Sequence, residues 1–94
     1  MSYSLSHGQR QDVGQIGLTH EDLPSPGQAP IDLRSWFGSQ EQDYALELEI
    51  GSGKGTFLLN QARNHPDVNY IGVEWARSYW RYASDRCRRH ECKN

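Results

Sequence analysis

The sequence has few cysteines, no long apolar run and no apolar N-terminus. Its two cysteines, Cys87 and Cys92, both lie close to the C-terminus, so they do not form the disulfide framework of a small secreted domain. No apolar stretch approaches the roughly 20 residues that a membrane helix needs, and MSYSLSHGQRQ at the N-terminus has no apolar core like that of a secretory signal. The sequence therefore predicts a soluble, cytoplasmic protein with no membrane partner.

Apolar residues make up only 35% of the 94 residues, which suits one small domain, or part of a larger one, with a modest core. The net charge of −2 conceals an uneven distribution. Residues 1–50 carry two basic and eight acidic side chains, whereas residues 51–94 carry eight basic and four acidic ones. We therefore expect a polyanionic partner to dock on the second half of the chain.

The N-terminal segment, residues 1–38, is rich in glycine, proline, serine and glutamine. Such a composition buries too little apolar surface to offset the entropy of ordering, so we predict a flexible, partly disordered segment that can order against a cofactor or a partner. Within it, Thr19 followed by Glu21 and Asp22 indicates one short helical turn. The first apolar cluster is IDLRSWF, residues 31–37.

From residue 45 onward, the sequence predicts strands that alternate with helices. Residues 45–50 predict a buried strand, interrupted by two glutamates, and a glycine-rich loop follows it. Helical spacing begins near Gly55 and must end before Pro66. Residues 68–73 predict a second strand that ends at Glu74, and residues 76–89 predict a second helix. This βαβα order indicates an α/β fold with parallel strands, the first half of a doubly wound domain with an incomplete sheet.

Three nucleotide-binding motifs compete for the loop EIGSGKGT. A P-loop requires G-x-x-x-x-G-K-[ST], but Lys54 is followed by Gly55, and the position of the first glycine is occupied by Leu48. A dinucleotide fingerprint requires G-x-G-x-x-G, and this loop is one residue too tight. The E-x-G-x-G-x-G pattern of S-adenosylmethionine-dependent methyltransferases is matched in full by the loop.

The chemistry of S-adenosylmethionine suits these residues. Glycines 51, 53 and 55 let the backbone approach the amino-acid end of the cofactor, and Glu49 can favour its cationic end directly or through water. Glu74 follows Glu49 by 25 positions, close to the ~20-residue offset of the acid that holds a ribose in such folds. The alternatives are a solvent-facing Glu49 and a Glu74 that only complements the dipole of the following helix.

A closer resemblance rests on LEIGSGKGTFLLNQA followed by PDVNYIGVEWARSYWRYASDR. These segments resemble the tRNA (guanine-N7-)-methyltransferase family, which has an EIGxGKG loop and an N-[YF]-[IL]-G-[VI]-E strand. Residues 39–94 would then form the N-terminal half of a Rossmann-like methyltransferase domain. The resemblance implies S-adenosylmethionine as cofactor, tRNA as partner, and cofactor binding by Glu49, Gly51, Gly53, Gly55 and Glu74.

The family's Pro-Asp-Pro-type catalytic motif and threonine-containing RNA-binding segment are not found in the sequence, which ends at HECKN. The resemblance therefore places the catalytic residues beyond Asn94, and we expect this polypeptide alone to be inactive. Two alternatives stay open: a methyltransferase for another substrate, because the loop reports the cofactor and not the acceptor, and a non-catalytic fragment that binds cofactor or RNA.

The second predicted helix carries the candidate RNA-binding arginines Arg77, Arg81 and Arg88 within a larger arginine cluster. The alternative is a solvated helix face on which Asp85 pairs with Arg81 and Arg89.

Four aromatic side chains near this helix can stack on bases, but we favour their packing against the sheet: Trp75, Tyr79, Trp80 and Tyr82. Cys87, His90 and Cys92 supply only three close ligands, so we expect no metal site.

Overall fold

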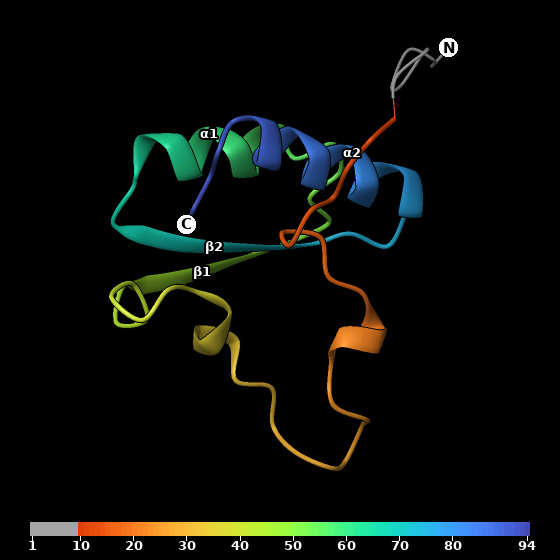
Figure 1. Ribbon diagram of the computed structural model, residues 1–94, viewed down its shortest axis with the longest axis vertical. Helices are drawn as coiled ribbons and strands as arrows, with labels where there is room; N and C mark the ends of the chain where they lie inside the picture. The colour runs from red at the N-terminus through yellow and green to blue at the C-terminus, as the bar shows by residue number, and fades with distance from the viewer. Residues whose placement is uncertain (1–9) are drawn as a thin grey trace.

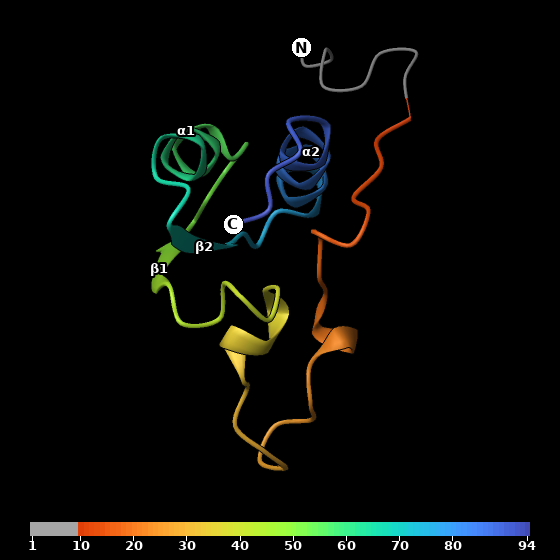
Figure 2. The same cartoon turned by 60° about the vertical axis from the view of Figure 1, so that its left-hand side comes forward.

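The computed structural model describes residues 10–94 and contains a small two-layer α/β unit (Figure 1). Strand β1 (Ala45–Ile50) and strand β2 (Val68–Val73) pair in parallel, with Ala45 opposite Val68 and Ile50 opposite Val73. Helix α1 (Thr56–Asn64) connects the strands and helix α2 (Arg77–Arg89) follows β2. Both helices cover the same face of the sheet (Figures 1 and 2). The predicted βαβα order and the parallel pairing are confirmed.

Local sequence signals explain where the helices begin and end. Helix α1 starts after Gly55, which has a left-handed φ of 79°, and it stops at Asn64, two residues before Pro66. Helix α2 ends in a Schellman motif, in which Glu91 N–H donates to the Arg88 carbonyl at 2.9 Å and Cys92 N–H donates to the Cys87 carbonyl at 3.0 Å. Glu91 adopts the left-handed conformation that this motif requires, with φ 54°.

The N-terminal part of the described chain contains two 3₁₀ helices, η2 (His20–Asp22) and η3 (Leu33–Trp36), on the side of the sheet away from α1 and α2 (Figures 1 and 2). The predicted turn at Thr19 is η2, and its capping box joins Thr19 and Asp22. Residues 1–9 of the predicted flexible segment lie outside the described residues. The flexibility of the remainder stays a prediction, as does the domain boundary at residue 38.

Residues 12–17 nevertheless contact α2 at several points. Asp12 N–H donates to the Asp85 carboxylate at 3.0 Å, and Arg88 Nε donates to the Asp12 carbonyl at 2.8 Å. Asp85 is also paired with Arg89 at 2.8 Å. The predicted pair of Asp85 with Arg89 is therefore present, whereas its second arginine partner is Arg88, not Arg81.

The buried apolar core is small and comes from the helices: Leu59, Ala62, Ala83 and Cys87. Contrary to the expectation of a buried first strand, Leu48 is 54% exposed and Ile50 is 73% exposed. The physical reason is the arrangement of the layers, because both helices cover one face of a two-stranded sheet. Parallel strands are usually covered on both faces.

Candidate cofactor site at the glycine loop

The glycine loop is a tight turn between β1 and α1 in which three glycines have positive φ. The values are 80° at Gly51, 58° at Gly53 and 79° at Gly55, a conformation that costs other residues about 1–2 kcal/mol each. A Cβ added at Gly51 or Gly53 would meet no atom within 4 Å, whereas one at Gly55 would lie 2.8 Å from the Ala83 Cβ. Gly55 therefore packs on α2, and the other two glycines face open space.

The loop is fastened to the end of the second strand by backbone hydrogen bonds. The Val73 carbonyl accepts from Gly51 N–H at 2.7 Å and from Ser52 N–H at 3.1 Å, and Gly55 N–H closes the turn on the Ser52 carbonyl at 3.0 Å. Because β1 and β2 are parallel and in register, their carboxyl ends meet here. This is the edge at which open parallel sheets bind their ligands.

Glu74 lies directly after β2 and binds the loop through its carboxylate. Its Oε2 accepts from Ala76 N–H at 2.7 Å and its Oε1 accepts from Gly53 N–H at 2.7 Å. These bonds, the one from Ala76 first, lower the pKa of Glu74 below its ordinary value of 4.5, because they stabilise the charged form. Each oxygen keeps acceptor capacity, so the carboxylate can hold the loop and still accept from a ligand hydroxyl.

Glu49, near the end of β1, presents a polar atom that the fold leaves unpaired. Its Oε1 is buried and has no hydrogen-bond partner among the described residues. Leaving such an acceptor unsatisfied costs about 1–3 kcal/mol. The two predicted acids therefore flank the same loop, Glu74 already bonded to it and Glu49 with one acceptor still unmatched.

Gly72, in β2, lies against the glycine loop, although in the sequence it stands out only as part of the N-[YF]-[IL]-G-[VI]-E pattern. A Cβ at this position would collide with Ser52 Oγ and would lie 2.7 Å from Leu58 Cδ2. The glycine therefore lets β2 approach the loop and α1 closely. A glycine inside a strand pattern is the signal that could have identified this contact.

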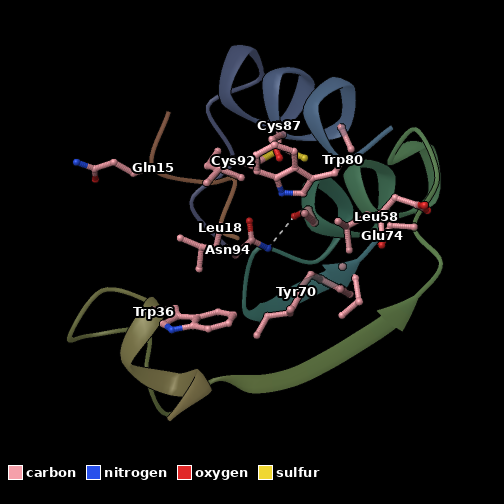
Figure 3. Close-up of a pocket in the computed structure, with 18 of the residues that line it drawn as sticks. Gln15, Leu18, Trp36, Leu58, Tyr70, Glu74, Trp80, Cys87, Cys92 and Asn94 are labelled. Atoms are coloured by element: carbon pink, nitrogen blue, oxygen red, sulfur yellow. Dashed lines mark hydrogen bonds between the residues drawn. The ribbon is translucent and has the colours of Figure 1, made fainter. Parts of the chain in front are cut away.

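A cavity of about 420 Å³ adjoins the site and reaches from the loop to the C-terminal residues. In Figure 3, Trp80, Cys87 and Cys92 lie on its α2 side, with Trp36 and Tyr70 on the opposite side. Glu74 lies at one end of the cavity, near Leu58. Of the aromatic residues expected to pack against the sheet, Trp75 is 99% exposed and Tyr79 is 41% exposed. Trp80 borders the cavity and lies beside Gly17.

The three candidate RNA-binding arginines occupy different environments on α2. Arg77 and Arg81 are exposed. Arg88 is half-buried and binds Asp12 and Asp85. Within residues 10–94, no group of three or more cysteine, histidine, aspartate or glutamate side chains is arranged to hold a metal ion. Neither α1 nor α2 is long and apolar enough to cross a membrane, and the same holds for the rest of the described chain.

A parallel sheet with a glycine loop after its first strand and an acid after its second is the arrangement of the first part of a doubly wound α/β domain. A family model described as "Putative methyltransferase" matches residues 43–94, and the chain belongs to this methyltransferase family. No solved structure matches the chain significantly.

Two curated relatives are both named tRNA (guanine-N(7)-)-methyltransferase. The protein from Rhodopirellula baltica is 41% identical over 76 residues, which cover 81% of this chain and 26% of the relative. The protein from Streptococcus pneumoniae (strain Hungary19A-6) is 39% identical over 62 residues, or 66% of this chain and 28% of the relative. The chain therefore spans about a quarter of the length of the curated relatives it matches.

Proposed function

We propose that this chain supplies the cofactor-binding part of an enzyme that transfers a methyl group from S-adenosylmethionine to N7 of a guanine in tRNA. The observation that carries the proposal is the bond between Gly53 N–H and the Glu74 carboxylate, which joins the glycine loop to the acid of the next strand at the carboxyl edge of the sheet. The names of the relatives supply the acceptor.

The residues present fit S-adenosylmethionine on two observations. Gly51 and Gly53 leave open space where other residues would carry a Cβ, so the amino-acid end of the cofactor can approach the backbone. Glu49 keeps a buried, unpaired oxygen that can meet an ammonium group directly or through water. Glu74 would accept from the ribose hydroxyls, and Gly55 would hold the loop against α2.

Methyl transfer to guanine N7 does not require the protein to remove a proton first. S-adenosylmethionine supplies, when bound, a methyl group activated by a sulfonium. The guanine N7 lone pair forms the new N–C bond as the S–C bond breaks, and no proton has to leave before the attack. Holding the two reactants in line is therefore the main contribution that the site can make. We assign no catalytic residue among residues 1–94.

We also propose that the exposed arginines of α2 contact the tRNA backbone. Arg77 and Arg81 are exposed and lie in the first half of α2, which begins four residues after the end of β2. Arg88 would contribute with the part of its guanidinium not used by Asp12 and Asp85. Phosphate contacts of this kind make binding salt-dependent.

The test uses the 94-residue chain and a graft in which residues 43–94 replace the matching segment of the Rhodopirellula baltica relative. We expect the chain to bind S-adenosylmethionine in a calorimetric titration and the graft to methylate tRNA at guanine N7. Glu74→Ala should weaken cofactor binding about tenfold or more, since it removes hydrogen bonds to a charged group.

Different failures have different meanings. A folded graft that neither binds S-adenosylmethionine nor is affected by Glu74→Ala would overturn the cofactor site. A graft that binds the cofactor but methylates another acceptor would retain the site and overturn the guanine assignment. Binding without any turnover would favour the non-catalytic alternative.

A further inference from the structure

We propose that Arg86 is a positioning residue for the cofactor: from α2 it fixes the peptide plane at the centre of the glycine loop. This inference rests on the proposed function, because it concerns the same loop. Arg86 lies 32 positions beyond Lys54, and neither the loop motif nor the spacing of the acids points to it. Its role follows from contacts between α2 and the loop.

Arg86 contacts the loop and the helix after it with one nitrogen. Its Nη1 donates to the Lys54 carbonyl at 3.1 Å and to Thr56 Oγ1 at 3.0 Å. The guanidinium carbon lies 5.5 Å from the centroid of the Tyr82 ring, which supports it from the same helix. The arginine therefore joins the loop, the first residue of α1 and the body of α2.

The bond to Lys54 matters because of what the other end of that peptide does. The Lys54 carbonyl and the Gly55 N–H belong to one planar unit. Gly55 N–H donates to the Ser52 carbonyl at 3.0 Å, and Arg86 binds the carbonyl at the opposite end of the plane. Together these two hydrogen bonds restrain the rotation of the peptide plane about the backbone dihedral angles on either side of it.

A loop with three glycines of positive φ needs such a restraint. Glycine loses more backbone freedom on ordering than any other residue, and the open space at Gly51 and Gly53 provides no packing that would hold them. The first half of the loop is held by the backbone bonds to the Val73 carbonyl, and the second half by three successive contacts: Gly53 to the Glu74 carboxylate, Lys54 to Arg86, and Gly55 to Ala83. Two of the three come from α2, so this helix positions the loop for the ligand.

This role also distinguishes Arg86 from the exposed arginines earlier in α2. Arg77 and Arg81 extend from the exposed part of α2, whereas Arg86 is half-buried and directed at the loop. Lysine would keep the charge but lacks the planar guanidinium that lies over Tyr82 while it donates to the loop. We therefore expect Arg86→Lys to restore only part of what Arg86→Met removes.

The experiment measures the affinity of the 94-residue chain for S-adenosylmethionine in three variants. Arg86→Met should raise the Kd about five- to twentyfold, and Arg86→Lys should give an intermediate value. Arg63→Met, a matched exposed arginine near the end of α1, should stay within about twofold of the unsubstituted chain. In ¹⁵N NMR spectra of Arg86→Met, the Gly53 and Gly55 amides should show faster exchange while the α1 amides keep theirs.

Kinetics of the graft distinguish positioning from general stability. Arg86→Met should raise KM for S-adenosylmethionine with little change in KM for tRNA. An unchanged KM and Kd in folded Arg86→Met protein would overturn the inference. If Glu74→Ala still weakens the cofactor in that case, the proposed function survives without Arg86. If neither substitution has an effect, the cofactor site itself is wrong.

Discussion

At the scale of single residues, Gly72 shows how little room the site has. Gly72→Ala would place a methyl group against Ser52 Oγ and 2.7 Å from Leu58 Cδ2, and relieving such overpacking costs about 1–3 kcal/mol. We expect a loss of this size in the free energy of unfolding measured by urea titration. In the double variant Gly72→Ala/Leu58→Ala, the loss of unfolding free energy should be smaller than the sum of the losses in the two single variants, because the shorter side chain relieves the collision. Strictly additive losses would contradict the proposed collision.

The carboxylate of Glu74 should make the free energy of unfolding depend on pH in the acidic range. Its pKa is lowered by the N–H groups of Ala76 and Gly53, so the ionised form stabilises the folded state. This contribution is complete above the ordinary value of about 4.5 and is lost as pH falls through the lower folded-state pKa. Glu74→Gln should therefore flatten the acidic part of a plot of unfolding free energy against pH, and an unchanged slope would contradict the hydrogen bonding.

The buried thiol of Cys87 should react slowly with alkylating reagents. Burial raises its pKa from 9.0 to about 11, with a further rise from the neighbouring Cys92. The thiolate is the reactive form, so at pH 8 its population is about 100-fold smaller than for an ordinary thiol. Burial also raises the pKa of Cys92, but this side chain is less buried than Cys87. Iodoacetamide should therefore alkylate Cys92 before Cys87, as followed by mass spectrometry in Cys87→Ser and Cys92→Ser variants. Equal rates would contradict the burial of Cys87.

At the scale of elements, Asp85 joins α2 to the N-terminal segment. Burial alone would raise the pKa of Asp85, but the Asp12 N–H, Arg89 and Arg88 outweigh it and lower the pKa. Asp85→Ala should cost about 1–3 kcal/mol of stability and increase hydrogen exchange at the amides of residues 12–17. Asp43→Ala, in an exposed position before β1, is the control. Exchange that stays the same would mean that the segment is held by other contacts.

The ends of the elements were predictable because their signals are local. Pro66 and Gly55 delimit α1, and short runs rich in apolar residues define both strands. The contact of Asp12 with Asp85 spans 73 positions and carries no local pattern, and the same holds for the bond from Arg86 to Lys54 across 32 positions. The sequence therefore predicted the loop and its acids, but not the α2 residues that hold the loop in place.

At the scale of the whole molecule, the sheet has two unequal faces. Side chains alternate along a strand, and the close approach of Gly72 to Leu58 places Glu49 and Gly72, which are paired, on the helix side. The opposite face carries Leu48, Ile50 and Val73, which are 54%, 73% and 46% exposed. The alternation of glutamates and apolar residues in β1 thus separates a face toward the site from an apolar face, and the two glutamates that interrupt the predicted strand mark this division in the sequence.

This apolar face predicts the behaviour of the 94-residue chain in solution. Exposed apolar side chains next to one another favour binding of hydrophobic dyes and self-association, so the chain should enhance the fluorescence of anilinonaphthalene sulfonate and should elute earlier from a sizing column as its concentration rises. Ile50→Thr with Val73→Thr should reduce both effects while keeping the β-branched side chains that suit a strand. Asn60→Thr, at an exposed position on α1, is the control, and an undiminished dye signal in the double variant would show that the dye binds elsewhere.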